Sequence, residues 1–257
     1  MKKFLAVLLA VVLCAGCMIG CNEKPQVTIE KVEDLNGLKI GVQGGTTGEA
    51  WVQENCADAK VASFKSGMDA ALDLKNGQID AVVLDELPAK AIVEKNPDLK
   101  ILDIRFTKEE YAIAIRKGDA ELQKIINDTI AEMKANGDYE ALVNAFMPAD
   151  GAIKIPATIE TDGDVIKMGT NAAFPPFEYV EGSEIVGFDI TMSQYVAKAA
   201  GKKLEVINMD FDALIGALQA NSIDFIAAGM SVTPDRLENV DFSDPYYESE
   251  QVIIVRK

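Results

Sequence analysis

Residues 223–236 read IDFIAAGMSVTPDR, and this stretch decides the fold class. Its apolar run DFIAA (224–228) predicts a buried strand. Thr233 is of the residue type that caps a helix and Pro234 suits a first helical position, so a helix is expected to begin there. A buried strand that leads into a helix is the building unit of an α/β sheet, where ligands bind beyond the carboxyl ends of the strands.

Arg236 falls in the first turn of this expected helix, where the helix dipole disfavours a cation. One interpretation is an anionic ligand nearby, because the guanidinium fork suits a carboxylate. The other is an exposed arginine paired with Asp235 or Glu238. Both interpretations stay open on these residues alone.

The same unit occurs earlier in the chain. The segment Leu74-KNGQ-Ile79-Asp80 resembles Leu218-QANS-Ile223-Asp224, and each predicts a helix, a polar turn and a strand that opens with Ile-Asp. Either two ordinary helix–strand units coincide, or an α/β lobe is duplicated and a binding site lies in the cleft between the copies.

Strands and helices are expected to alternate through both halves of the chain, which predicts parallel sheets. Apolar runs predict strands at 38–42, 81–84, 100–104, 111–116, 165–169, 204–208 and 251–256. Helical patterns cover 46–55, 67–75, 87–95, 122–133, 139–146, 188–199 and 212–220. Residues 148–164, rich in Pro, Gly, Thr and acidic residues, predict a linker.

The loop GGTTGE (44–49) follows one of these strands and opens a helix. Thr46 is a candidate N-cap, with Glu49 completing a capping box. The free N–H groups of such an end attract an anion, although the loop also serves as a plain helix cap. It lacks the lysine of a phosphate-binding loop, which argues against a nucleotide.

Three further residues follow strands or precede helices in the same way. Asp85 lies just past the run AVVL (81–84), where it either holds an ammonium group or caps a helix. The prolines of the segment 171–178, NAAFPPFE, stiffen a loop that either presents Phe174 to a ligand or buries it in the core. Phe211 precedes a helix and is a candidate for an opposing ring.

Composition narrows the function classes. The 257 residues carry a net charge of −16, which argues against a nucleic-acid binder. The chain has no histidine, which removes Ser-His and Cys-His nucleophiles and histidine metal sites. We expect no metal and no cofactor.

The N-terminus is typical of an export signal. Two lysines precede the apolar segment FLAVLLAVVLCA (4–15), which is too short to span a bilayer. Gly16-Cys17 and Gly20-Cys21 both resemble the bacterial lipoprotein cleavage site, and the polar residues after Cys21 favour Cys21. We expect a signal peptide over 1–20, a tether over 21–35 and a lipid anchor outside the bacterial cell membrane. A soluble, cleaved signal peptide and a cysteine metal cluster are the alternatives.

Several motifs in series resemble the bacterial extracellular solute-binding proteins for polar amino acids. TNAAFPPFEY, IVGFDI, DFDALIGAL, IDFIAAGMSVTPDR and VDFSDPYYES resemble the first lobe of that family. DLNGLKIGVQGGTTGE, NGQIDAVVLDE and AEMKANGDYEALVNAFM resemble its second lobe and closing helices. The resemblance covers nearly all of 33–257 and implies a two-lobed, type II periplasmic-binding-protein-like α/β fold.

The order of these halves is exchanged relative to the family, so the chain is expected to be circularly permuted. Residues 36–106 are expected to form the smaller lobe and 107–257 the larger one, with the linker 148–164 joining the family's old ends. Only the segment near 104–111 is expected to cross between the lobes. Cutting one of two hinge strands in this way is expected to loosen the open–closed equilibrium.

The resemblance also implies a ligand site. Positions that hold a ligand α-carboxylate in the family correspond to Arg236, Ser231 and Thr47, with Thr46 capping the same loop. Asp85 and the Gly229 backbone correspond to those that hold the α-ammonium, and Phe174 and Phe211 to the aromatic walls. Asn171 stands where some relatives that prefer cationic ligands have an acid. Its neutrality argues against arginine or lysine as the ligand, although Glu178 or Gln43 could compensate.

The implied function is the substrate-binding lipoprotein of an ABC importer, which captures a free amino acid and delivers it to a permease with its ATPase. It is expected to perform no chemistry and to bind no nucleic acid. The alternatives are a periplasmic dehydratase-like enzyme on the same fold, a ligand-sensing or adhesin module, and a degenerate or domain-swapped protein.

Overall fold

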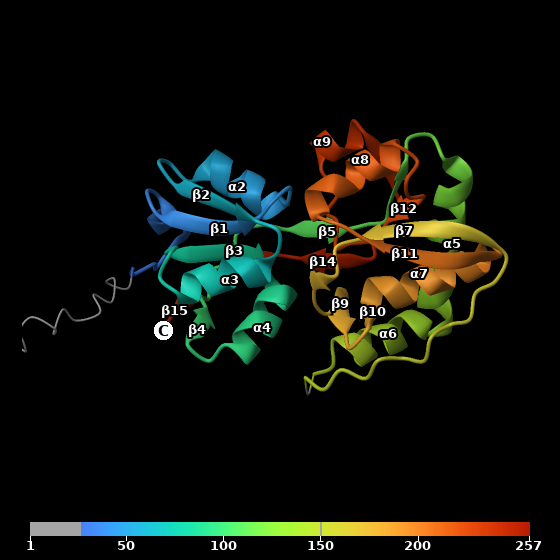
Figure 1. Cartoon of the computed structure of the whole chain (residues 1–257), viewed down its shortest axis with the longest axis horizontal. Helices are drawn as coiled ribbons and strands as arrows, with labels where there is room; N and C mark the ends of the chain where they lie inside the picture. The colour runs from blue at the N-terminus through green and yellow to red at the C-terminus, as the bar shows by residue number, and fades with distance from the viewer. Residues whose placement is uncertain (1–26, 150) are drawn as a thin grey trace, which may run out of the picture.

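The structure is a computed structural model that describes residues 27–149 and 151–257. Two lobes lie side by side, and each is built around a five-stranded sheet flanked by helices (Figure 1). The predicted two-lobed α/β fold is therefore confirmed. The circular permutation stays a prediction, and Cys17 and Cys21 lie outside the described residues.

The smaller lobe is a mixed sheet with helices on both faces. Its strands are, in spatial order, β2 (Lys60–Phe64), β1 (Lys39–Gln43), β3 (Ala81–Asp85), β15 (Gln251–Arg256) and β4 (Leu99–Ile101). Strand β1 runs parallel to β2 and β3, whereas β15 runs antiparallel to β3 and β4. Its helices are the 3-10 helix η1 (Val32–Leu35), α2 (Thr47–Asn55), α3 (Gly67–Lys75) and α4 (Glu86–Lys95).

Strand β3 shows why the sheet is covered on both sides. All five of its residues are buried, as expected for a central strand with apolar side chains facing both ways. Val83 packs in one cluster with Val52 of α2, and Val82 packs in another with Leu74 of α3. The loops at the ends of β1 and β3 are thereby held rigidly.

The larger lobe is built on the same plan. Its strands are, in spatial order, β11 (Lys202–Asn208), β7 (Asp164–Thr170), β12 (Phe225–Ile226), β6 (Ala114–Arg116) and β13 (Val240–Phe242). A small hairpin sheet joins β8 (Ala173–Phe174), β9 (Glu178–Glu181) and β10 (Glu184–Val186). The helical segments are α5 (Ala120–Asn136), α6 (Asp138–Phe146), α7 (Phe188–Ala199), η2 (Phe211–Ala213), α8 (Leu214–Gln219) and α9 (Pro234–Leu237).

The two faces of this sheet carry different helices. Leu214 and Leu218 of α8 pack with Ile226 of β12 on one face. On the other face, α5 and α7 supply apolar side chains such as Ile126 and Met192 to the cluster that contains Ile166 and Met168 of β7. The sheet is therefore a buried middle layer, and its polar loops emerge toward the other lobe.

Two segments join the lobes, and they pair with each other. Strand β5 (Glu109–Tyr111) runs antiparallel to β14 (Tyr247–Ser249), and both lie between the two lobes (Figure 1). We call β5 and β14 the hinge ribbon. The prediction that only the segment near 104–111 crosses is wrong, because the chain crosses a second time between β14 and β15. The expected loosening of the hinge therefore has no structural basis.

The assignment of all residues 107–257 to the larger lobe is also wrong for one strand. Strand β15 inserts between β3 and β4, in the sheet of the smaller lobe. Its run QVIIVR indicates a buried central strand but carries no information about which sheet receives it. The remaining predicted lobe boundaries stay predictions.

The predicted linker 148–164 forms neither helix nor strand over residues 148, 149 and 151–163. It is nevertheless tied to the larger lobe. The backbone N–H of Ile159 donates to Gln194 Oε1 at 3.0 Å, and Thr161 Oγ1 accepts from the N–H of Leu204 at 3.1 Å. The linker thus runs along the larger lobe, outside the cleft.

Candidate functional site

A small cavity lies between the lobes, and all nine predicted ligand-binding residues line it. Its volume is about 10 Å³, enough for roughly one water molecule. The lining residues are Gln43, Thr46, Thr47, Asp85, Asn171, Phe174, Glu178, Phe211, Ala228, Gly229, Ser231 and Arg236. We call this space the cavity. The structure therefore brings the predicted residues together, while their binding roles stay predictions.

The cavity forms because loops from both sheets leave the carboxyl ends of strands and face each other. Gln43 ends β1 and Asp85 ends β3 in the smaller lobe. From the larger lobe, Asn171 follows β7 and Gly229 lies beyond β12. This is the edge at which α/β sheets place ligands.

Arg236 bridges the lobes at one end of the cavity. Its guanidinium donates to the carbonyl of Ser231 at 2.7 Å and, across the cleft, to that of Gly45 at 2.9 Å. The same group lies 5.4 Å from the centre of the Phe211 ring. The alternative pairing with Asp235 or Glu238 is not observed among the ion pairs of the described residues. Burial lowers the pKa of Arg236, opposed by the nearby carboxylates of Glu109 and Asp85.

The helix that carries Thr46 and Thr47 begins as predicted. The hydroxyl of Thr46 accepts from the N–H of Glu49, and the Glu49 carboxylate accepts from the N–H of Gly45 at 2.7 Å. This differs from a strict capping box, in which that carboxylate returns to the cap residue itself. The result is a rigid loop that turns the hydroxyl of Thr47 toward the hinge ribbon.

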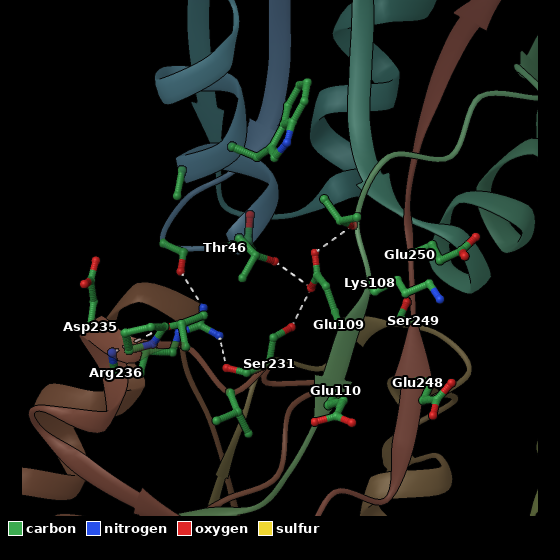
Figure 2. Close-up of a pocket in the computed structure, with 18 of the residues that line it drawn as sticks. Thr46, Lys108, Glu109, Glu110, Ser231, Asp235, Arg236, Glu248, Ser249 and Glu250 are labelled. Carbon is green, nitrogen blue, oxygen red and sulfur yellow. Dashed lines mark hydrogen bonds between the residues drawn. The ribbon is translucent and has the colours of Figure 1, made fainter.

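Glu109 is the residue that the sequence reasoning missed. It belongs to the hinge ribbon, is 8% exposed, and accepts hydrogen bonds from Thr47 and Ser231 (Figure 2). The two-residue period of a strand could have indicated that Glu109 is buried. Glu109 and Tyr111 lie on the same face of β5, and Tyr111 belongs to an apolar run. The charged triplet KEE (108–110) conceals this, since such residues are normally exposed.

Asp85 lines the cavity from the smaller lobe, at the end of β3. It accepts hydrogen bonds from the hydroxyls of Tyr111 and, at 3.4 Å, Ser249, both in the hinge ribbon. Asp85 stands at the N-cap position of α4, but its side chain makes no capping bond to that helix. Burial raises the pKa of Asp85 to about 7, and the charge of Glu109 contributes to the rise. A cation placed here would offset that cost.

Phe174 lies at the boundary between the core and the cavity. Phe174 packs against Phe177 and Tyr111 with ring centres 6.0 and 6.5 Å apart, and its edge lies under the Gly229 backbone. Gly229 has a φ of +53°, and an added Cβ would lie 2.7 Å from the Phe174 ring. Phe174 is therefore both a core residue and a wall of the cavity, so the two alternatives are not exclusive.

Two buried amides connect the lobes at the floor. Gln43 Nε2 donates to Asn171 Oδ1 at 3.0 Å, and Asn171 Nδ2 donates to the carbonyl of Met209 at 2.7 Å. The position of Asn171 therefore contributes a neutral bridge between the lobes. Together with the Arg236–Gly45 bond, it shows that the lobes are in contact and the cleft is closed.

Glu178 adds an unusual buried acid to the cavity wall. It is fully buried, and neither carboxyl oxygen has a hydrogen-bond partner among the described residues. Burial, followed by the charge of the neighbouring Asp189, raises the pKa of Glu178 well above its usual range. Burial raises the pKa of Asp189 to about 6. In its protonated form Glu178 can donate to Asp189, which would satisfy both carboxyls.

These buried acids predict that the ligand-free protein is more stable in mild acid. Asp85, Glu178 and Asp189 all have raised pKa values, so the folded state binds more protons than the unfolded chain between about pH 4 and their folded pKa values. The stabilising contribution of their protonated forms is complete below about pH 4 and is lost as the pH rises through about 6 to 7.

We therefore expect the melting temperature of the ligand-free protein to rise when the pH falls from 8 to 5. Glu178→Gln is the matched variant, and it should reduce this rise because a neutral amide replaces one of the acids. A melting temperature that falls over this range would contradict the prediction.

A second, larger space opens beside the cavity. This groove has a volume of about 1230 Å³ and shares Thr46, Thr47, Ser231 and Arg236 with the cavity. Figure 2 shows Glu109 between the Thr46 loop and Ser231 at the inner side of this groove. Many of its other side chains are acidic, including Glu110, Glu248 and Glu250. Glu109 lines the groove but does not line the cavity.

Within residues 27–149 and 151–257, no cluster of acidic or cysteine side chains is arranged to hold a metal ion. None of the helices in the same residues has both the length and the apolar character needed to cross a bilayer.

Comparisons with known proteins match parts of the chain. Residues 166–257 match the family model of bacterial extracellular solute-binding proteins, family 3. The arginine-binding extracellular protein ArtP of Bacillus subtilis is 48% identical over 90 residues, which are 35% of this chain and 35% of ArtP. The L-cystine-binding protein TcyJ of Escherichia coli is 37% identical over 124 residues, or 48% of this chain and 47% of TcyJ.

A solved structure is similar in the same way. The arginine-bound form of domain 1 from TmArgBP is 38% identical and covers 36% of this chain and 80% of that domain, with a TM-score of 0.32. The chain thus spans between about one third and one half of the two curated relatives. Over residues 166–257, the chain is thus similar to the bacterial extracellular solute-binding proteins of family 3.

Proposed function

We propose that this chain binds a free amino acid in the cavity between its lobes. The observation that carries the proposal is that one cavity is lined by both Arg236 from the larger lobe and Asp85 from the smaller lobe. A zwitterion needs a cation for its carboxylate and an anion for its ammonium, because buried charges must be paired. Two lobes that supply opposite charges to one ligand would be held together by it.

We further propose a preference for amino acids with a cationic side chain. The cavity is lined by one cation, Arg236, and by two acids, Asp85 and Glu178. After Asp85 pairs with the ammonium, the cavity still contains Glu178, a second acid whose neighbour Asp189 is also acidic and which has no cation beside it in the cavity other than Arg236. A cationic side chain would restore the ionised form of Glu178 and pair with it. The name of the similar protein ArtP supports this choice.

Binding is proposed to require opening at the hinge ribbon. The cavity holds roughly one water molecule, so an amino acid cannot enter while the lobes are in contact. The bonds from Arg236 to Gly45 and from Gln43 to Asn171 would break on opening. After entry, the lobes would close on the ligand by a hinge motion.

We propose, with this function, the further properties that the family resemblance implies. The chain would deliver its ligand to an ABC permease with its ATPase, perform no chemistry itself, and work outside the cell membrane on a lipid anchor at Cys21 or Cys17. The circular permutation is supported by the family match, which begins only after the linker 148–164. Residues 39–101, before the match, supply four of the five strands of a second sheet of similar plan.

The test is a thermal-shift panel of the twenty amino acids on the whole protein, followed by calorimetry. We expect L-arginine or L-lysine to raise the melting temperature, because a ligand at 100 times its Kd stabilises the folded state by about 2.7 kcal/mol. L-Glutamate is the matched control, since its side chain would meet Glu178 with a like charge. A panel in which no amino acid shifts the transition would refute the proposal.

A further inference from the structure

Glu109 receives four hydrogen bonds, and two of them come from opposite lobes. Its Oε2 accepts from Thr47 Oγ1 of the smaller lobe at 2.7 Å and from Ser231 Oγ of the larger lobe at 2.5 Å. Its Oε1 accepts from Gln251 Nε2 at 3.0 Å and from Thr107 Oγ1 at 3.2 Å. A carboxylate from the hinge ribbon therefore holds the two lobes together.

The donors of Thr47 and Ser231 are fully used by this arrangement. A hydroxyl group has one O–H to donate, and each of these hydroxyls donates it to Glu109. A ligand carboxylate can only accept hydrogen bonds. It therefore cannot bond to either hydroxyl unless Glu109 first releases it.

Charge leads to the same conclusion. A ligand carboxylate beside Ser231 and Arg236 would lie close to the ionised carboxylate of Glu109, and like charges in a buried site repel strongly. Glu109 has space into which it can withdraw, because its side chain lines the groove of about 1230 Å³ and not the cavity. Figure 2 shows it between the donors, at the boundary of that open space.

We propose that Glu109 is an internal competitor for the carboxylate of the ligand. In the ligand-free closed form, its carboxylate accepts hydrogen bonds from the hydroxyls of Thr47 and Ser231 and thereby connects the lobes. When a ligand binds, Glu109 withdraws into the groove and the ligand carboxylate takes its place. Glu109 thereby sets the affinity for carboxylate-bearing ligands, an inference that rests on the proposed amino-acid binding function.

The test compares Glu109→Gln with the wild type, using L-arginine and agmatine as probes. Agmatine is arginine without its carboxylate, so it has no need to displace Glu109. The amide side chain of the variant is similar in size and can accept hydrogen bonds from the two hydroxyls, but it has no charge. It should therefore compete less strongly with the carboxylate of the ligand. Calorimetry should show L-arginine binding about tenfold more tightly to the variant, because hydrogen bonds to charged groups are the stronger ones, while agmatine gains nothing.

The matched control is Glu110→Gln, which removes the same charge one residue away. Glu110 is exposed in the groove, and its backbone carbonyl, which accepts from Val232, is unchanged by the substitution. This control should leave L-arginine binding as in the wild type. If Glu109→Gln does not fold, Glu109→Asp replaces it. The shorter side chain weakens the hydrogen bonds to the hydroxyls but keeps the charge, so a smaller gain for L-arginine and none for agmatine is expected.

The outcomes separate the two proposals. A wild type that binds L-arginine as tightly as Glu109→Gln, or more tightly, overturns the competitor role and leaves the amino-acid function standing. An equal gain for agmatine also overturns it, because the effect is then not one of carboxylate competition. If no amino acid binds either protein, both proposals fail together. If only the variant binds L-arginine, both are supported.

Discussion

Arg236→Ala is expected to lower the affinity for the amino-acid ligand by at least a hundredfold. The substitution leaves the ligand carboxylate in a closed cavity without a cation, and removing one partner of a buried ion pair costs about 3–5 kcal/mol. Each 1.4 kcal/mol raises the Kd about tenfold, so this cost corresponds to a Kd at least a hundredfold higher than that of the wild type. Calorimetry with the ligand chosen from the amino-acid panel measures it.

The fold should survive this change, because the bonds that Arg236 makes lie at the cleft and not in either core. The control is Lys203→Ala on β11, which removes a cation from an exposed position in the larger lobe. It should bind normally. An Arg236→Ala protein of unchanged affinity would overturn the assignment of the carboxylate end of the cavity.

Gly187→Ala is expected to produce the largest loss of stability. Gly187 precedes α7 with a φ of +143°, and an added Cβ would lie 2.0 Å from the carbonyl oxygen of Phe177. That carbonyl cannot move aside easily, because it accepts the N–H of Asp189 at 2.9 Å. We expect destabilisation of about 3 kcal/mol or more, from backbone strain together with overpacking.

Thermal unfolding measures this effect, and a loss of about 3 kcal/mol corresponds to roughly 6–12 °C in a protein of this size. Gly182→Ala is the matched control, since Gly182 also has a positive φ, +64°, but an added Cβ meets nothing within 4 Å. Its cost should be limited to backbone strain of about 1–2 kcal/mol. If both variants melt at the same temperature, the close approach to Phe177 is not what requires glycine.

The sequence predicted an element best where its local pattern of apolar residues matches the residues that the fold buries. The helix of residues 67–75 has the predicted bounds, because Ser66 caps it and its buried side chains Ala70, Ala71 and Leu74 face the sheet. The strand at residues 81–85 was equally clear, since a continuous apolar run fits only a strand covered on both faces. In the cavity, the resemblance to a family supplied residues that no local pattern connects.

Other elements could not be predicted because their environment comes from distant parts of the chain. Strand β2 has only partly buried residues at the sheet edge, so its sequence KVASF shows no apolar run. The lobe to which β15 belongs depends on pairing with β3 and β4, far away in sequence. The role of Glu109 depends on donors from both lobes, which only the closed arrangement brings together.

The position of β15 has a consequence for how the protein is made. Strands β1 to β4 are synthesised early, yet β3 and β4 are not joined in one sheet until β15 fits between them. The smaller lobe therefore emerges from the ribosome with two unpaired strand edges. These edges remain exposed until residues 251–256 have also emerged. Since these residues follow the whole larger lobe, the first lobe to be translated is the last to be completed.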